Sequence, residues 1–216
     1  MSTSIKYIGL TNYANALNIQ EQTHQDVLNG ASDSIMVCEH PHVFTFGKSA
    51  NKNNLLVDEN LLKKINATIH QIDRGGDITY HGPGQLVCYP IINLRKWGIG
   101  VKKYVEILEE SIISTLKHFN IDAYQIKHLT GIWVGDKPQI PRKIGAIGIR
   151  IKQGVSMHGF ALNINTNLDY FNYINPCGIT DKQVTSIRQE DTQCTLNEFS
   201  DKFIEIFLKS WESIKM

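Results

Sequence analysis

The sequence of 216 residues lacks several features that mark common classes of protein. Its charges nearly cancel, with 22 Lys and Arg against 21 Asp and Glu, so composition gives no argument for a nucleic-acid or membrane partner. No apolar run approaches the roughly 18 residues that a membrane span requires. Residues 1–6 lack the apolar core of a secretory signal, so we expect a cytoplasmic protein.

Cysteine and the common phosphate-binding glycine patterns are equally sparse. Four cysteines are widely spaced with no CxxC, which in a cytoplasmic chain indicates thiols rather than disulfides. No Gly-Lys-Ser/Thr follows a glycine loop, and Gly-x-Gly-x-x-Gly is not matched, so neither nucleotide fingerprint is present. The length allows one large domain or two small ones with a proper core.

Apolar periodicity divides the chain into alternating strands and helices. Strands are predicted at 34–39, 67–72, 86–94, 131–135, 143–151 and 158–165, with a turn and a second extended piece at 40–47. Helices are predicted at 12–28, 55–65 and 101–119. Thr11 is a possible cap of the first helix. A capping box from Thr195 to Glu198 begins a last amphipathic helix. This order predicts an α+β fold, with a mixed β-sheet flanked by helices.

The most unusual stretch is residues 74–85, Arg-Gly-Gly-Asp-Ile-Thr-Tyr-His-Gly-Pro-Gly-Gln, between two predicted strands. A plain hairpin needs only about two to five loop residues, so this stretch predicts a shaped loop that holds a ligand. Gly75 and Gly76 can point backbone N–H groups at an acceptor, and Arg74 suits a carboxylate or phosphate. The alternative is an ordinary surface loop.

Cys177 is the candidate nucleophile because it lies between Pro176 and Gly178, in a turn rather than in a core periodicity. A nucleophilic thiol must ionise, and its ordinary pKa of about 8.5 requires a cation or base nearby. The candidates for that group are Arg74, His81, Lys143, Arg150 and His158. Lys143 opens an apolar, glycine-rich strand, where desolvation lowers an amine pKa and makes it a proton acceptor. The alternatives are a solvated lysine at a strand end and, for His158, a structural histidine.

A metal site at residues 38–42, Cys-Glu-His-Pro-His, is a weaker hypothesis. It holds three possible ligands, but Pro41 separates the histidines and no second ligand pair has zinc-finger spacing. We therefore expect no metal. Basic residues are scattered rather than clustered, so we expect no nucleic-acid partner either.

Four motifs occur in one order along most of the chain. They are HPHVFT at 40–45, RGGDITYHGPGQ at 74–85, KIGAIG through HGFALN at 143–163, and NPCG at 175–178. Together they resemble the bacterial lipoyl (octanoyl) transferases of lipoate biosynthesis. The resemblance implies the fold of the biotin and lipoate protein ligases, over a single domain of residues 1–216. It also implies octanoyl transfer from octanoyl-acyl carrier protein to a lysine of a lipoyl domain.

The resemblance also assigns roles to residues. Cys177 would carry the acyl thioester, and Lys143 would be the general acid and base that lowers the thiol pKa. The implied acyl-binding residues are Arg74, Gly75, Gly76, Asp77, Ile78, Thr79, Tyr80, His81, Ala146, Ile147, Gly148, His158, Gly159, Phe160 and Ala161. Among these we expect Tyr80, Ile147 and Phe160 to wall the eight-carbon chain. The implied acceptors are lipoyl domains of 2-oxoacid dehydrogenases and the glycine cleavage H protein.

Elementary chemistry agrees with these roles. An acyl thioester is already activated, and its transfer to an amine is downhill, so we expect no nucleotide or other cofactor. Two alternatives stay open. One is an ATP-dependent lipoate or biotin protein ligase on the same fold, which would not need Cys177. The other is a non-catalytic module that only binds acylated carrier protein.

Overall fold

The computed structural model describes residues 3–127, 129–135, 140–175 and 183–215. The strands are β1 Ser4–Leu10, β2 Ser34–Glu39, β3 Val43–Phe46, β4 Thr68–Gln71, β5 Ile78–His81, β6 Gln85–Ile91, β7 Ala123–Ile126, β8 Leu129–Val134, β9 Arg142–Lys152, β10 Val155–Asn163 and β11 Gln183–Val184. The α-helices are α1 Tyr13–Leu28, α2 Glu59–Lys64, α3 Leu94–Trp97, α4 Val101–His118 and α5 Leu196–Glu212. Short 3-10 helices are η1 Lys52–Asn54, η2 Leu168–Tyr173, η4 Arg188–Glu190 and η5 Ser213–Lys215. The α+β prediction is confirmed.

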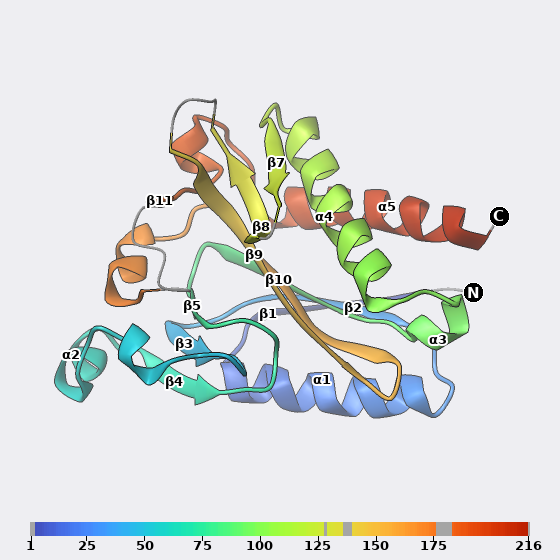
Figure 1. Cartoon of the computed structure of the whole chain (residues 1–216), viewed down its shortest axis with the longest axis horizontal. Coiled ribbons are helices and arrows are strands. Elements are labelled where there is room, and N and C mark those ends of the chain that lie inside the picture. The colour runs from blue at the N-terminus through green and yellow to red at the C-terminus, as the bar shows by residue number, and fades with distance from the viewer. Residues whose placement is uncertain (1–2, 128, 136–139, 176–182, 216) are drawn as a thin grey trace.

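The described strands form one large mixed sheet and one small sheet. The large sheet has the order β1-β2-β6-β10-β9-β8-β7, with β11 beside β9, and the small sheet has the order β4-β3-β5. β1 runs parallel to β2 and β11 parallel to β9, whereas the neighbours from β2 to β7 pair antiparallel. In Figure 1 the long β9–β10 hairpin crosses the centre of the molecule. Its turn lies beside the start of α3, where the Leu94 N–H donates to the Gly154 carbonyl at 2.9 Å.

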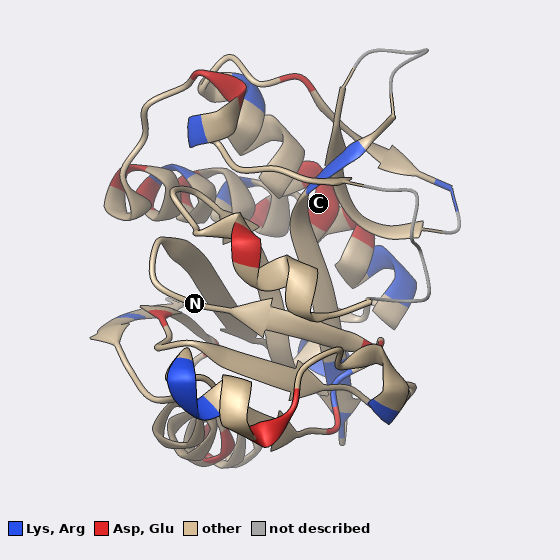
Figure 2. Cartoon of the chain, turned by 90° about the vertical axis from the view of Figure 1, so that its left-hand side faces the viewer, with Lys and Arg blue, Asp and Glu red and all other residues tan. Residues whose placement is uncertain are grey.

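Helices cover both faces of the large sheet. Along β6, Leu86 and Cys88 join the apolar core with α4 and α5, whereas Val87 and Tyr89 join the smaller cluster with α1. This is the alternation that the pleat of a strand imposes. Figure 1 shows α1 on one side of the sheet and α4 with α5 on the other. In Figure 2 basic and acidic segments are interspersed on the helices turned toward the viewer, as the balanced composition leads one to expect.

The helix ends follow local chemistry. The predicted capping box is present, because the Thr195 hydroxyl accepts from the Glu198 N–H and the Glu198 carboxylate accepts from the Thr195 N–H. The predicted cap of α1 was wrong. Asn12 occupies the N-cap position, and the Thr11 hydroxyl donates instead to the Ile8 carbonyl. No helix in the described part of the chain has both the length and the apolarity to span a membrane.

Four of the described strands were not anticipated, and the shortest of them is the two-residue β11. β1 and β7 are edge strands with few buried side chains, so their apolar pattern is weak. The remaining one, β5, lies inside the stretch 74–85, which is therefore not one continuous loop. It pairs with β3 from Val43↔His81 to Phe46↔Ile78. A four-residue strand is below the length at which periodicity separates strand from loop.

Candidate functional site

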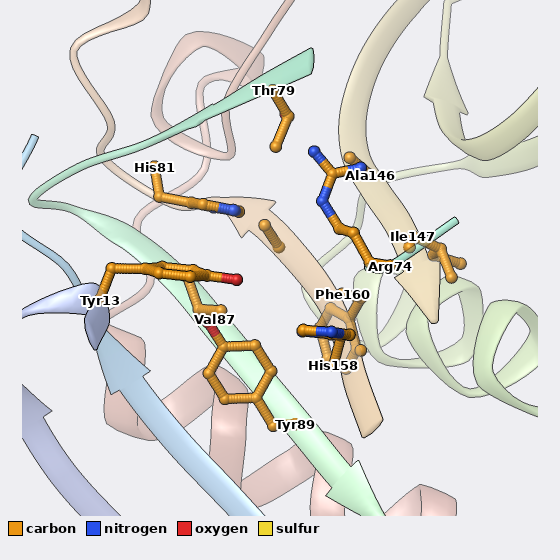
Figure 3. Close-up of a pocket in the computed structure, with 13 residues that line it drawn as sticks. Tyr13, Arg74, Thr79, His81, Val87, Tyr89, Ala146, Ile147, His158 and Phe160 are labelled. Carbon is orange, nitrogen blue, oxygen red and sulfur yellow. The ribbon is translucent and has the colours of Figure 1, made fainter. Parts of the chain in front are cut away.

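A cavity lies where the small sheet and the segment after β4 meet β9 and β10. We call it the main cavity. It is lined by ten of the expected acyl-binding residues, namely Arg74, Thr79, His81, Ala146, Ile147, Gly148, His158, Gly159, Phe160 and Ala161. Figure 3 shows the Tyr13 and His81 side chains extending toward Arg74 and Thr79, with Tyr89, His158 and Phe160 on another side. The fold thus joins three segments that are far apart in the sequence.

Two expected residues of β5 do not line this cavity. Ile78 and Tyr80 belong to an apolar cluster on the opposite face of the small sheet. The Tyr80 ring stacks on Tyr170 at 4.9 Å between centroids, and its hydroxyl is 2.8 Å from His42 Nδ1. The expectation that Tyr80 walls the acyl chain is therefore corrected. Alternation along the strand gives the cavity Thr79 and His81 instead.

The glycine-rich turn before β5 is held by the protein itself. The Gly75 N–H donates to the Ile149 carbonyl at 2.9 Å, so it is not a donor waiting for an anion. The Asp77 carboxylate accepts from the Ile78 N–H at 2.7 Å and from the Asn54 amide at 2.6 Å. Gly76 has a positive φ of 89° and accepts from the Ser49 N–H. These three residues shape the turn and do not line the main cavity.

Arg74 is buried and braced from two sides. Its guanidinium donates to the Thr45 carbonyl at 2.8 Å, the Thr45 hydroxyl at 3.0 Å and the Gly75 carbonyl at 3.0 Å. Its stem packs directly on β9, where a Cβ at Gly148 would lie 3.0 Å from Arg74 Cδ and 3.1 Å from the Gly75 carbonyl. Gly148 is therefore required for the close approach of this turn to the strand. Arg74 lines the cavity as a fixed cation.

His81 is a neutral acceptor on the cavity wall. Asn163 donates its amide to the Thr185 carbonyl at 2.9 Å, so its oxygen accepts from Gln85 Nε2 at 2.9 Å. The Gln85 oxygen, 2.7 Å away, then accepts from His81 Nδ1. This chain fixes the His81 tautomer with Nε2 unprotonated. Burial lowers the pKa of His81 to about 3, with His40 and Arg74 adding to the effect.

His158 is also neutral near pH 7. Burial lowers its pKa to about 4, and the neighbouring Arg74 and Arg150 cations act in the same direction. Its Nε2 is 3.0 Å from one oxygen of the Asp73 carboxylate, and Arg150 pairs with the other oxygen. Neutral histidines are poor partners for a thiolate. Their burial and lowered pKa values therefore argue against His81 and His158 as the cation that activates Cys177.

Sequence reasoning missed Tyr13, Val87 and Tyr89, which also line the main cavity. The Tyr89 hydroxyl lies 2.7 Å from His40 Nε2, and His40 Nδ1 lies 2.6 Å from the Thr11 carbonyl. The Tyr13 and His81 rings are nearly parallel, with centroids 6.2 Å apart. All seven residues of β6 are buried, so its sequence pattern could not reveal which of them face a cavity.

Lys143 lines a second, smaller cavity beside the first. We call it the lysine cavity. Its walls are Thr79, Gln85, Lys143, Gly145, Ala146, Ala161, Asn163, Phe171 and Val184. It shares Thr79, Ala146 and Ala161 with the main cavity. The two cavities therefore lie side by side, and the lysine side chain lies next to the expected acyl-binding region.

Cys177 and its neighbours Pro176 and Gly178 lie outside the described residues. The chain on either side of them reaches the lysine cavity, because Phe171 and Val184 both line it. Val184 pairs directly with Lys143 in the β11–β9 ladder. The pairing of Cys177 with Lys143 stays a prediction from the sequence, to which these flanking positions add support.

Residues 38–42 point toward different partners rather than one ion. Glu39 accepts from the Gly84 N–H at 2.7 Å, and His42 faces the Tyr80 hydroxyl. Burial raises the pKa of the Cys38 thiol, which lies 3.6 Å from His40 Nε2. Across the ranges that the structure describes, no three His, Cys, Asp or Glu side chains are grouped to hold a metal.

Comparisons with known proteins agree with this arrangement. Residues 12–208 match the family described as the lipoyl protein ligase A/B catalytic domain. An octanoyltransferase of Bacteroides fragilis is 54% identical over 164 residues, covering 75% of this chain and 74% of that protein. An octanoyltransferase of Solibacter usitatus is 44% identical over 209 residues, covering 96% of this chain and 92% of that protein.

Solved structures with the same fold are more distant in sequence. A lipoate protein ligase from Thermoplasma acidophilum with bound lipoic acid has a TM-score of 0.78 at 15% identity, covering 98% of this chain and 87% of that one. The biotin protein ligase of Aquifex aeolicus has a TM-score of 0.55 at 10% identity, covering 99% and 71%. These likenesses confirm the predicted biotin/lipoate protein ligase fold.

Proposed function

The chain belongs to the lipoyl protein ligase A/B catalytic domain family, and we propose that it transfers octanoyl groups through a thioester formed on Cys177. It is an acyltransferase of the octanoyltransferase kind, whose acceptors are lipoyl domains. In the proposal the donor is octanoyl-acyl carrier protein. The acceptor lysines belong to lipoyl domains of 2-oxoacid dehydrogenases and the glycine cleavage H protein.

One observation carries this proposal: the main cavity and the lysine cavity lie side by side and share three wall residues. An acyl chain lying along β9 and β10 would end where Lys143 lies. The apolar part of the wall, including Ile147, Phe160 and Ala161, suits an alkyl chain, because each buried CH₂ contributes about 0.8 kcal/mol. The reacting carbonyl would then sit beside the lysine amine, where proton transfer is needed.

Cys177 and Lys143 are sufficient to account for every acyl and proton transfer in the proposed reaction. Lys143 takes the proton of the Cys177 thiol, and the thiolate attacks the donor thioester carbonyl. The carrier thiol leaves with the proton that Lys143 returns, and octanoyl-Cys177 remains. The lysine of the lipoyl domain then attacks this second thioester and loses a proton to Lys143. An amide forms, and the Cys177 thiol is restored.

The experiment compares two acyl donors on a purified lipoyl domain. With octanoyl-acyl carrier protein and no ATP, the protein should add one octanoyl group to the lipoyl domain, measured by its intact mass. Free octanoate with ATP should give no product. The reverse pattern would assign the chain to the ATP-dependent ligases. Tight binding of the acylated carrier with no product in either reaction would leave only a binding module.

A further inference from the structure

We propose that Gly131 and Trp133 on β8 are positioning residues that hold the Lys143 side chain at the end of the main cavity, an inference that rests on the proposed function. Neither residue belongs to the motifs that suggested the family. Both were predicted only as part of a strand. Their contacts with Lys143 give them a second role.

The β8–β9 ladder changes register beside the lysine. Trp133 pairs with Lys143, but the residue before it on β8, Ile132, pairs with Gly145 rather than with Ile144. Ile144 is therefore an extra residue on β9, and its side chain is fully buried in the core. Such a bulge re-aims a side chain and is often found next to active sites. Here it fixes the direction in which Lys143 leaves the strand.

Gly131 provides the space into which that side chain runs. A Cβ at this position would lie 2.4 Å from Lys143 Cε and 3.1 Å from Lys143 Nζ. It would also lie 2.8 Å from the Gly145 carbonyl, and the backbone has a φ of +132°. The end of the lysine side chain thus lies directly over the Gly131 backbone. Any side chain at this position would displace the amine.

Trp133 holds the amine from another side. Lys143 Nζ lies 5.2 Å from the centroid of the indole ring. The ring is buried, and its Nε1 donates to the Leu129 carbonyl at 3.2 Å, so its orientation is fixed. A cation within about 6 Å of an indole face is attracted to it. Unlike a carboxylate, the indole carries no charge that would bind the lysine proton tightly, so the amine can be placed and still exchange its proton.

The first test uses Trp133→Phe and Trp133→Leu, whose side chains are similar in volume but differ in having a ring face. Single-turnover acylation of the protein by octanoyl-acyl carrier protein is measured from pH 6 to 10 by intact mass. At neutral pH the Leu variant should be about 10-fold slower than the Phe variant, and its rate should depend on pH differently. Equal rates and equal pH profiles in the two variants would overturn the role of Trp133.

A double-mutant cycle then asks whether Trp133 acts through the lysine. If it does, Trp133→Leu should lower the acylation rate about 10-fold in the wild-type background but should not lower it further in the Lys143→Ala background. Equal slowing in both backgrounds would mean that Trp133 acts only on the fold. The wild type with no acyl-enzyme at all would instead refute the proposed function, so the two failures are distinct.

Gly131→Ala tests the space over the strand, with Gly135→Ala as its matched control. Gly135 has a similar φ of +118°, but a Cβ there would lie 3.3 Å from the end of the Arg142 side chain and 3.7 Å from the Ile140 carbonyl, with no contact to Lys143 among its three nearest atoms. We expect Gly131→Ala to slow acylation at least 100-fold and Gly135→Ala to retain the wild-type rate. Thermal unfolding of both variants is recorded. If Gly131→Ala folds and acylates at the rate of the control, Gly131 has no part in placing the lysine.

Discussion

Two regions of the molecule share strands of one sheet but differ in the polarity of the side chains they bury. One is the core under α4 and α5, and the other is the main cavity. The core is filled by large apolar side chains such as Phe203, Phe207 and Trp211, all almost fully buried. The cavity wall instead buries Arg74, His81 and His158. Apolar packing stabilises the fold without directional demands, whereas each buried polar group must have a partner.

This difference separates stability from chemistry. Substitutions in the core should change the free energy of unfolding and leave the reaction of folded molecules intact. Substitutions at the two cavities should do the opposite, except where a buried polar partner is lost. Four variants or conditions test that separation.

Lys143→Ala should lower the rate of acyl transfer by about 100- to 10,000-fold, because the proton acceptor and donor is removed. The free energy of unfolding should change by less than about 1 kcal/mol, since the side chain is only partly buried. Lys143→Arg should also be slow, because a guanidinium keeps the charge but does not deprotonate. Lys152→Ala, an exposed position on the same strand, is the control. A Lys143→Ala variant with the wild-type rate at neutral pH would remove Lys143 from the mechanism.

Phe207→Ala should show the reverse pattern. The ring is fully buried and packs against Phe203 and Trp211, with centroids 5.6 Å and 5.4 Å away. Its loss should lower the free energy of unfolding by about 3–5 kcal/mol in urea titration. Transfer per folded molecule should stay within about twofold of wild type, and Phe207→Leu should lose less stability. A large loss of transfer without a loss of stability would show that the core and the cavity are not separable.

The buried histidines should make the fold sensitive to acid. His158 has a folded-state pKa of about 4, below its ordinary value of about 6.5, so the unfolded chain binds more protons between these values. The contribution of neutral His158 to the free energy of unfolding is intact above about pH 6.5 and is lost as the pH falls toward 4. At pH 5 the loss is about 1–2 kcal/mol. His81 should act in the same direction, since its pKa is lowered to about 3.

Urea titrations at pH 7, 6 and 5 measure the slope of the free energy of unfolding against pH. His158→Asn should flatten it, because asparagine does not titrate and tolerates the left-handed backbone found here, with a φ of +56°. His118→Asn, at an exposed position at the end of α4, should keep the wild-type slope. If the His158 and His118 variants have the same slope, the buried imidazole is not the origin of the acid sensitivity.

Thr195→Ala should have the smallest effect of the four. It removes the hydroxyl that caps α5 and accepts from the Glu198 N–H at 3.2 Å. We expect a loss of about 1 kcal/mol in the free energy of unfolding and no change in transfer. Thr195→Ser should restore most of the stability. Equal stability of the Ala and Ser variants would mean that the cap contributes nothing measurable to α5.

The sequence predicted best where one signal dominated. The Thr195 capping box and the amphipathic pattern after it predicted α5, and the apolar runs at 143–151 and 158–165 predicted the two strands of the β9–β10 hairpin. Both depend on neighbours within a few residues. The three segments of the main cavity were found through family motifs, because their meeting depends on strand order that local patterns do not encode.

The misses have a common physical cause. Tyr89 and Val87 face the main cavity from β6, but a strand buried on both faces shows no alternation. Tyr80 was assigned to the cavity because its motif as a whole was, although alternation sends its ring to the other face of β5. The roles of Gly131 and Trp133 depend on a β-bulge, which becomes visible only when two strands are paired.

The central claim is that octanoyl transfer passes through Cys177, and intact-protein mass after mixing with octanoyl-acyl carrier protein without ATP tests it most directly. The thioester mechanism predicts an added octanoyl group on the protein that is released by hydroxylamine and is absent in Cys177→Ser. It would be contradicted if the Cys177→Ser variant octanoylated a lipoyl domain at the wild-type rate, or if the wild type did so with no such adduct at any time of reaction.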